Sequence, residues 1–171
     1  MNTFAKGWYL IYTRPRQEKK VAAHLHQHRI DAYLPLVKML RQWHDRKKYV
    51  EVPLFPSYVF VYLTDMQGYY NSLNCEGALC YVTSSKKTVR VNEKVIDDIR
   101  LVVNTATDIE VSFERFEPGQ QLVIHEGPFA GLTCEVVQYK SRQKIAVHIQ
   151  CLERNLLVEM SLACLSTPAP E

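Results

Sequence analysis

Short apolar runs alternate with amphipathic stretches over the first hundred positions of the chain. GWYLIYT (7–13) is rich in β-forming residues and predicts a strand, after which Pro15 favours the start of a helix. Within the next fourteen residues (16–29), Val21, Ala22 and Leu25 recur at helical spacing among polar neighbours. The pattern therefore begins with a strand followed by an amphipathic helix.

A hairpin is predicted next. YLPLVKMLRQWH (33–44) is an extended pattern interrupted by Pro35, and DRKK (45–48) predicts a hairpin tip that leads back into YVEVPLFPSYVFVYL (49–63). Thr64 is then expected to cap a short helix that ends near Gly77. Further along come a strand at 78–83, a short extended piece at 88–91, and a helix capped by Asn92 that carries Val95, Ile96, Ile99, Val102 and Val103 on one face.

The order β-α-β-β-α-β plus a last helix predicts an α+β, ferredoxin-like split βαβ domain, with helices on one face of the sheet. Residues 104–115 lack a helical period, carry net negative charge and predict a linker. Beyond them, four or five short strands punctuated by glycines predict a small all-β barrel.

The strand 58–63 is apolar on both faces. Strand alternation places Val59, Val61 and Leu63 on one face, and Tyr58 and Phe60 on the other. The aliphatic face is the natural side for helix packing. We therefore expect the aromatic face to lie on the open side of the sheet, as an exposed apolar patch of the kind that binds proteins.

Charge is distributed unevenly. Residues 1–104 carry 16 Lys and Arg against 9 Asp and Glu, whereas the remainder carries 5 against 9. The basic part is suited to phosphate contacts and the acidic part is not. One basic cluster lies in and around the first helix: Arg14, Arg16, Lys19, Lys20 and Arg29. A second lies at the hairpin tip, beside Trp43 and His44, and consists of Arg41, Arg46, Lys47 and Lys48. Either cluster is a solvated surface or a nucleic-acid contact, and the charge excess supports the contact.

Catalytic and metal-binding patterns find little support. The cysteines (Cys75, Cys80, Cys134, Cys151 and Cys164) are odd in number and form no CxxC pair, which favours reduced thiols in a cytoplasm. His24 and His28 are spaced for one helix face, but no acidic or cysteine partner accompanies them. No apolar run is long enough to span a membrane, and no secretory signal is evident. We expect a binding protein without enzymatic activity, metal or cofactor.

Three segments resemble the NusG family of transcription elongation factors: WYLIYTRPRQEKKVAAHL, PLFPSYVFVYL and FEPGQQLVIHEGPFAGLTCEVVQY. The resemblance covers essentially the whole chain in the right order. It implies an N-terminal NGN domain (1–104), a linker (105–115) and a C-terminal KOW domain (116–168) that forms an SH3-like barrel. A cytoplasmic, monomeric factor that binds RNA polymerase and suppresses pausing or termination is the implied function.

The resemblance also implies sites. The apolar patch that docks on the β′ clamp helices of the polymerase matches Tyr12, Phe55, Tyr58, Phe60 and Tyr81, and the segment facing the β-subunit gate loop falls on Tyr69, Tyr70 and Asn71. The helix face that contacts the non-template DNA strand matches Arg14, Lys20, His24 and Gln27. The KOW turn, in a domain that binds a ribosomal protein or Rho in relatives, matches Gly127, Pro128, Phe129, Ala130 and Gly131.

Two departures bear on the subfamily. Housekeeping members usually have FPGYV where this chain has Ser57, and S-G-x-E where it has Thr13-Arg14-Pro15-Arg16. Both, with Leu34-Pro35, favour specialised RfaH-like or UpxY-like antiterminators of polysaccharide loci over a housekeeping factor. A ribosome-associated RNA-binding KOW protein is the alternative of another class, and the acidic barrel argues against it.

Overall fold

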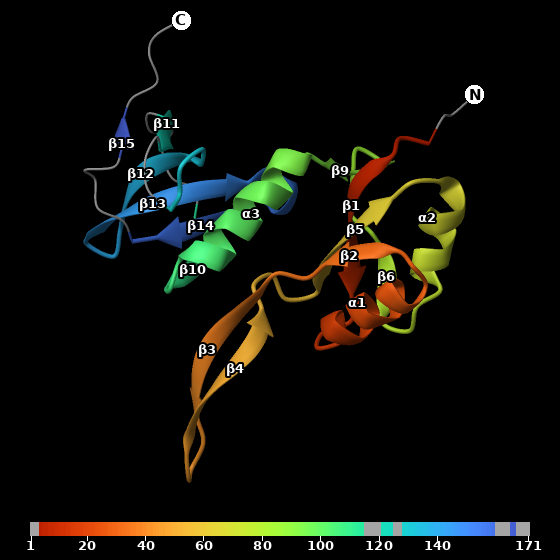
Figure 1. Ribbon diagram of the computed structural model, residues 1–171, viewed down its shortest axis with the longest axis horizontal. Coiled ribbons are helices and arrows are strands. Elements are labelled where there is room, and N and C mark those ends of the chain that lie inside the picture. Colours follow the sequence, from red (N-terminus) through yellow and green to blue (C-terminus); the bar gives the residue numbers. More distant parts are fainter. Residues whose placement is uncertain (1–3, 115–120, 125–127, 160–164, 167–171) are drawn as a thin grey trace, which may run out of the picture. The chain divides into compact units, whose positions relative to one another are not determined.

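Figure 1 shows a computed structural model of the chain, which describes residues 4–114, 121–124, 128–159 and 165–166. The fold divides into two compact units, 1–96 and 97–171. Each unit has its own sheet and is described separately below. Among the described residues, no helix combines the length and apolar character needed to cross a membrane.

The first unit is built on an antiparallel sheet in which β1 and β5 are the two central strands. The strand order is β2-β5-β1-β6, and the short strand β9 also pairs with β1. Two helices connect these strands. The elements are β1 (Gly7–Thr13), α1 (Glu18–Gln27), β2 (Asp31–Tyr33), β5 (Tyr58–Leu63), α2 (Met66–Leu73), β6 (Ala78–Tyr81) and β9 (Arg90–Val91).

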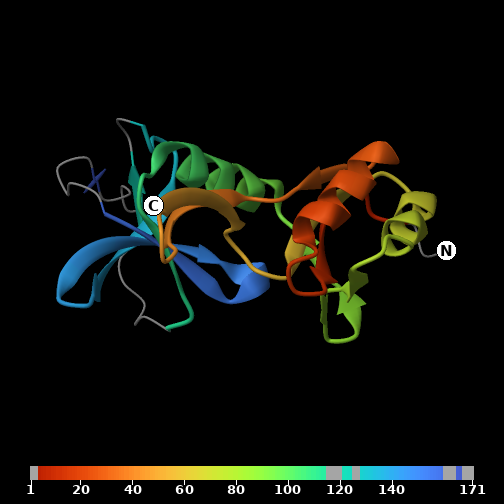
Figure 2. The same ribbon diagram turned by 90° about the horizontal axis from the view of Figure 1, so that it is seen from below.

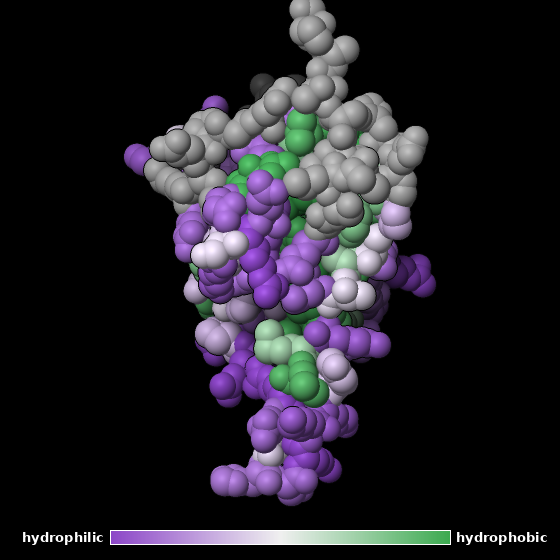
Figure 3. Space-filling model, turned by 90° about the vertical axis from the view of Figure 1, so that its left-hand side faces the viewer, coloured by the Kyte–Doolittle hydropathy of each residue, from purple (hydrophilic) through white to green (hydrophobic). Residues whose placement is uncertain are grey.

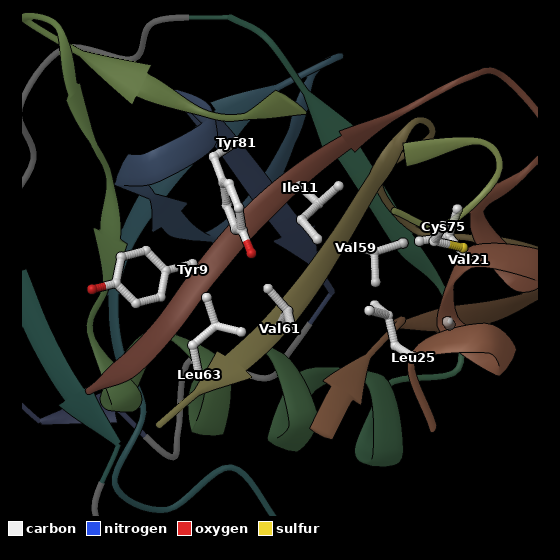
Figure 4. Packing of buried hydrophobic residues seen from close by; sticks show 10 residues of the cluster. Tyr9, Ile11, Val21, Leu25, Val59, Val61, Leu63, Cys75 and Tyr81 are labelled. Atoms are coloured by element: carbon white, nitrogen blue, oxygen red, sulfur yellow. The ribbon is translucent and has the colours of Figure 1, made fainter. Parts of the chain in front are cut away.

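One face of this sheet forms the core of the unit. The β1–β5 register places Ile11 opposite Val59 and Tyr9 opposite Val61, so these side chains share a face. Figure 4 shows them packed together with Val21 and Leu25 of α1. Tyr69 and Leu73 of α2 pack against the same cluster. The prediction that Val59, Val61 and Leu63 form the helix-packed face is confirmed.

The predicted hairpin exists but is not part of the central sheet. β3 (Leu36–Gln42) and β4 (Lys47–Pro53) pair only with each other, and Figures 1 and 2 show them leaving the sheet as a separate ribbon. Pro35 separates β2 from β3, because proline has no N–H for the ladder, and its carbonyl instead accepts from the Leu54 N–H at 2.8 Å. A smaller hairpin, β7 (Thr83–Ser84) and β8 (Lys87–Thr88), follows β6.

Both later helices begin at side-chain caps. Asp65, rather than the expected Thr64, caps α2 and accepts from the Gly68 N–H at 2.7 Å. Asn92 caps α3 (Glu93–Thr105) as predicted, through the Lys94 N–H at 2.9 Å. Ile96, Ile99 and Val102 of α3 are buried, and the division between the two units falls within this helix.

The second unit is a six-stranded antiparallel sheet in the order β10-β14-β13-β12-β11-β15. The segment expected to be a linker contributes a strand to it: β10 pairs with β14 over its whole length. The expectation of a free connection is therefore wrong for these residues. The strands are β10 (Ile109–Ser112), β11 (Gln121–Ile124), β12 (Thr133–Tyr139), β13 (Arg142–Ile149), β14 (Arg154–Val158) and β15 (Leu165–Ser166), with a 3-10 turn, η1 (Gln150–Leu152), before β14.

The predicted KOW turn joins β11 to β12. The Gly131 N–H donates to the Ile124 carbonyl at 2.8 Å, and the Leu132 N–H donates to the Phe129 carbonyl at 3.1 Å. Gly131 has a φ of +89°, a conformation that favours glycine. Pro128 to Gly131 thus form a tight turn, while Gly127 and Cys164 lie outside the described residues.

Glu110 anchors β10 to the rest of its sheet. One carboxylate oxygen accepts from the Tyr139 hydroxyl at 3.0 Å and from the Lys140 ammonium at 2.5 Å, and the other accepts from Lys144 at 3.1 Å. These bonds, first the one from Lys140, lower the pKa of Glu110 from its ordinary 4.5 to about 2. β10 is therefore held by a side-chain network as well as by its ladder with β14.

We predict that Glu110→Gln lowers the thermal unfolding midpoint at pH 7 by a few degrees. Because the pKa of Glu110 is lower in the folded chain, its stabilisation is fully present above about pH 4.5 and is lost as the pH falls toward 2. The difference between variant and wild type, followed by far-UV circular dichroism, should therefore shrink between pH 5 and pH 2. Asp108→Asn, an exposed carboxylate beside β10, is the control. An equal loss at every pH would contradict the role of the charge.

Candidate functional site

The second face of the β1–β5 pair is lined with aromatic rings. The register pairs Trp8 with Tyr62, Leu10 with Phe60 and Tyr12 with Tyr58. The Trp8–Tyr62 and Tyr12–Tyr58 ring centroids are each 5.4 Å apart. We call this the aromatic face, and its members are Trp8, Leu10, Tyr12, Tyr58, Phe60 and Tyr62.

The centre of the aromatic face is buried. Phe60 is 0% exposed and Phe55 1% exposed, and their rings meet edge to face with centroids 6.3 Å apart. Tyr33 of β2 flanks Phe60 from another side, at 6.2 Å. The expectation that Phe60 is exposed is therefore wrong, and Phe55, which the resemblance matches to the docking patch, is buried as well. Exposure is greater at the other end of the face, where Tyr12 is 38% exposed and Tyr58 is half-buried.

Tyr81 lies on the opposite face from the one expected. β6 pairs Tyr81 with Ile11, whose side chain lies in the core, and Cys80 with Tyr12; a β-bulge follows between Tyr12 and Thr13. The Tyr81 hydroxyl bonds to Ser72, and burial raises the pKa of Tyr81 to about 12. We therefore remove Tyr81 from the predicted docking patch, because it is a core residue.

The corner where β1 meets α1 is fixed by a buried carboxylate. Glu18 is 4% exposed and accepts from the Ser57 N–H at 2.7 Å. The Ser57 carbonyl in turn accepts from the Thr13 N–H, and the Arg14 N–H donates to the Gly77 carbonyl, both at 2.8 Å. This corner holds the turn before β5 against the end of β1, next to Tyr12 and Tyr58. Sequence reasoning missed Glu18, because a charged residue is expected to be exposed. Its spacing to Val21, Ala22 and Leu25 nevertheless places it on the buried face of α1.

The cations predicted on the first helix are exposed at this corner. Arg14 and Arg16 precede α1, and Arg16 adopts a φ of 64°. Lys20 forms an ion pair with Glu76 at 2.7 Å, which lowers the pKa of Glu76 through that hydrogen bond. Because both side chains are exposed, a polyanion can displace this pair at little cost.

The other polar residues predicted for the DNA contact lie near the C-terminal end of α1. The His24 and His28 rings stack with centroids 4.2 Å apart, and the His28 ring nitrogen bonds to the His24 carbonyl at 2.9 Å. Gln27 is exposed beside them. In the described part of the chain, no group of three or more His, Cys, Asp or Glu residues is arranged to hold a metal ion.

The residues predicted to face the polymerase gate loop divide into two kinds. Tyr69 stacks on Tyr81, with ring centroids 4.2 Å apart, and serves the core. Tyr70 is 59% exposed, and Asn71 is exposed and accepts from Gln67 at 2.9 Å. Tyr70 and Asn71 are therefore available to a partner, whereas Tyr69 positions the helix that carries them.

The family model described as transcription termination factor NusG matches residues 6–100. This match covers more than half of the chain, including the whole β1–β5 sheet and both helices that pack on it. The chain belongs to the NusG family.

A solved structure shares the fold of this chain. A structure described as domain interaction in Thermotoga maritima NusG is 20% identical, covers 95% of this chain and 97% of that chain, and has a TM-score of 0.53. The MjSpt4:Spt5 complex in conformation B is 15% identical, with coverage of 90% and 99% and a TM-score of 0.32. Membership of the NusG family rests on the match over residues 6–100.

Ser57 stands at the position where the sequence departs from the usual FPGYV motif of the NusG family, and its φ is 69°. A left-handed conformation costs a residue with a Cβ about 1–2 kcal/mol, and glycine avoids this cost. The Glu18 carboxylate holds the turn in this conformation in spite of the cost.

We predict that Ser57→Gly raises the free energy of unfolding of the first unit by about 1 kcal/mol, because the backbone strain is removed. Urea unfolding followed by tryptophan fluorescence measures this, since both tryptophans, Trp8 and Trp43, lie in the first unit. Ser57→Ala keeps the Cβ and should show no gain. Equal stability of the glycine and alanine variants would argue against strain at this turn.

Proposed function

We propose that the chain is a transcription elongation and antitermination factor that binds RNA polymerase and suppresses pausing or termination. Membership of the NusG family is the observation that carries this proposal. The family resemblance assigns polymerase docking to the sheet face opposite the helices, and that face is the aromatic face in this chain. No chemical step is required, because a protein that binds the closed polymerase clamp more tightly shifts the polymerase toward that state.

The exposed end of the aromatic face is proposed as the first contact with the β′ clamp helices. Tyr12 and Tyr58 form a cross-strand pair there, and tyrosine is enriched among the residues that dominate binding energy at interfaces. Phe55 and Phe60 lie along the same face and form its apolar base. Tyr70 and Asn71 on α2 are proposed to face the β-subunit gate loop, with Tyr69 supporting them from the core.

A nucleic-acid contact is proposed for the basic surface of the first unit. Arg14, Arg16, Lys20, His24 and Gln27 lie at or on α1, and Arg46, Lys47 and Lys48 lie at the hairpin tip. The Lys19 ammonium donates to the Glu51 carbonyl at 2.8 Å, so α1 and β4 are in direct contact. Exposed cations arranged in this way favour the phosphates of the non-template DNA strand, with an affinity that falls as salt rises.

The second unit is proposed to be a KOW domain with an SH3-like barrel, and the first to have the ferredoxin-like topology. The β12-β11-β15 pairing and the 128–131 turn support the KOW assignment of the second unit. The order β2-β5-β1-β6 supports the ferredoxin-like topology of the first unit. A ribosomal protein or Rho is the proposed partner of the barrel. The monomer is proposed to act in the cytoplasm.

Two departures in sequence support a specialised paralogue, related to RfaH and UpxY-like antiterminators, over a housekeeping factor. They are Ser57 and the segment Thr13 to Arg16. Both lie at the corner fixed by Glu18, where the aromatic face meets the basic residues. A position of the gene among polysaccharide-synthesis genes would support this assignment, and a position among ribosomal and general transcription genes would contradict it.

The double variant Tyr12→Ala/Tyr58→Ala tests the docking surface. We predict at least a tenfold loss of affinity for core RNA polymerase, because two interface tyrosines of this kind typically contribute that much. The measurement is co-precipitation of the full chain with purified core polymerase over a protein titration.

Phe113→Ala is the matched control, since Phe113 is an exposed aromatic residue of the second unit. Far-UV circular dichroism establishes that each variant is folded. Capture of the double tyrosine variant at the wild-type level would remove the aromatic face from the proposal.

A further inference from the structure

The β3–β4 hairpin has two different faces. Its register pairs Arg41 with Lys48, and the Trp43 N–H donates to the Arg46 carbonyl at 2.8 Å, which continues the same pairing to the tip. Side chains of alternate residues share a face, so these four residues lie on one side of the ribbon. We call this the cationic hairpin face, and its members are Arg41, Trp43, Arg46 and Lys48.

The reverse side of the ribbon has a mixed composition. There Lys38 is paired with Glu51, Leu40 with Tyr49, and Gln42 with Lys47. Glu51 opposes the charge of Lys38 directly across the two strands. The cationic hairpin face carries no carboxylate of its own, because Glu51 is on the reverse side and Asp45 is in the tip loop.

The cations of this face are available to a ligand. Arg41, Arg46 and Lys48 are all exposed, and none of the ion pairs formed within the described ranges involves them. Figure 3 shows the end of the molecule where the hairpin projects as predominantly hydrophilic, with a small apolar patch above the tip. Alternate residues of a strand are about 7 Å apart, so the positive charges form a row along the ribbon rather than a single point.

Trp43 adds a flat apolar surface to this row of charges. It is 46% exposed, so part of its ring surface is accessible to a ligand. In a protein that binds an unpaired nucleic-acid strand, aromatic rings stack on bases while cations contact the backbone phosphates. The combination of Trp43 with Arg41, Arg46 and Lys48 meets both requirements on one face.

We propose that the cationic hairpin face binds an unpaired nucleic-acid strand, with phosphates on Arg41, Arg46 and Lys48 and one base stacked on Trp43. This inference rests on the proposed nucleic-acid role of the first unit and adds the hairpin face and the stacking residue, Trp43. An intact duplex fits less well, because its bases are stacked on each other and offer no free ring surface to Trp43. The Lys19 ammonium of α1 donates to the Glu51 carbonyl of β4, so the hairpin also contacts the helix that carries the other basic residues.

The test is the binding of fluorescently labelled dT12, rU12 and a 12-base-pair DNA duplex to the full chain, measured by anisotropy at 50 and 200 mM salt. We expect single strands to bind more tightly than the duplex. The preference between dT12 and rU12 then identifies the natural strand as DNA or RNA. Because Trp8 is buried and Trp43 is exposed, quenching of tryptophan fluorescence by unlabelled dT12 reports stacking on Trp43 directly.

Variants separate stacking from charge. Trp43→Ala should weaken single-strand binding about 5- to 100-fold and leave the salt dependence unchanged, while Trp43→Phe should restore most of the affinity. Arg41→Ala and Lys48→Ala should each weaken binding and also lower the slope of log K against log salt by about 0.7. The matched controls on the reverse side are Tyr49→Ala and Lys38→Ala, for which we expect little change.

The proposal is overturned if Trp43→Ala binds dT12 and rU12 as tightly as the wild type. It is also overturned if Tyr49→Ala and Lys38→Ala lose as much affinity as Trp43→Ala and the variants of the cationic hairpin face. Duplex binding as tight as single-strand binding would also overturn it. All of these exposed positions lie outside the core, and far-UV circular dichroism checks the fold of each variant. The anisotropy assay contains no polymerase, so a negative result there leaves the proposed polymerase docking untouched. A negative result in polymerase capture likewise leaves the proposed strand binding untouched.

Discussion

The antiparallel pairing of β1 with β5 is the constraint on which the rest of the first unit depends. Both strands are apolar on both faces, and their register places Ile11 opposite Val59 on one side and Leu10 opposite Phe60 on the other. A sheet of this kind has to bury two faces. The helices α1 and α2 cover the first, and Phe55 and Tyr33 pack on part of the second around Phe60. Tyr12 and Tyr58, at the end of the second face, retain exposure and become the natural place for a partner.

The corner fixed by Glu18 connects this aromatic end to the charged surface of the unit. A buried carboxylate is tolerable when hydrogen bonds replace its lost hydration, and the Ser57 N–H supplies one of them. The same corner carries Arg14 and Arg16, and one turn later Lys20. Apolar and cationic contacts are thereby held within one rigid framework. The proposed binding of both a protein surface and a nucleic acid needs such a fixed relation, because each contact then pre-positions the other.

The two units use their charges differently. In the second unit, the Glu110 carboxylate accepts hydrogen bonds from Lys140, Lys144 and Tyr139, and these bonds attach β10 to the sheet. In the first unit the cations of the hairpin remain exposed, and Lys20 pairs with the exposed Glu76. Exposed pairs contribute little to stability and exchange readily. The charges that stabilise the fold and those that remain available for binding are thus separate sets of residues.

The amino-acid sequence by itself determined most of the elements of the first unit, the hairpin at 45–48 and the assignment of Val59, Val61 and Leu63 to the core. These follow from alternation and helical spacing, which are local properties of the chain. It also carried the motifs of the NusG family. Only the tertiary structure decided the face of Tyr81, because that face is set by the pairing of β6 with β1, which places Tyr81 opposite Ile11. The burial of Phe60, the strand β10 and the role of Glu18 likewise depend on partners distant in sequence: Phe55 and Tyr33, β14, and Ser57. Register and burial are set by contacts between segments that are distant in sequence. A local pattern of residues does not encode which distant segment will pair with it or pack on it.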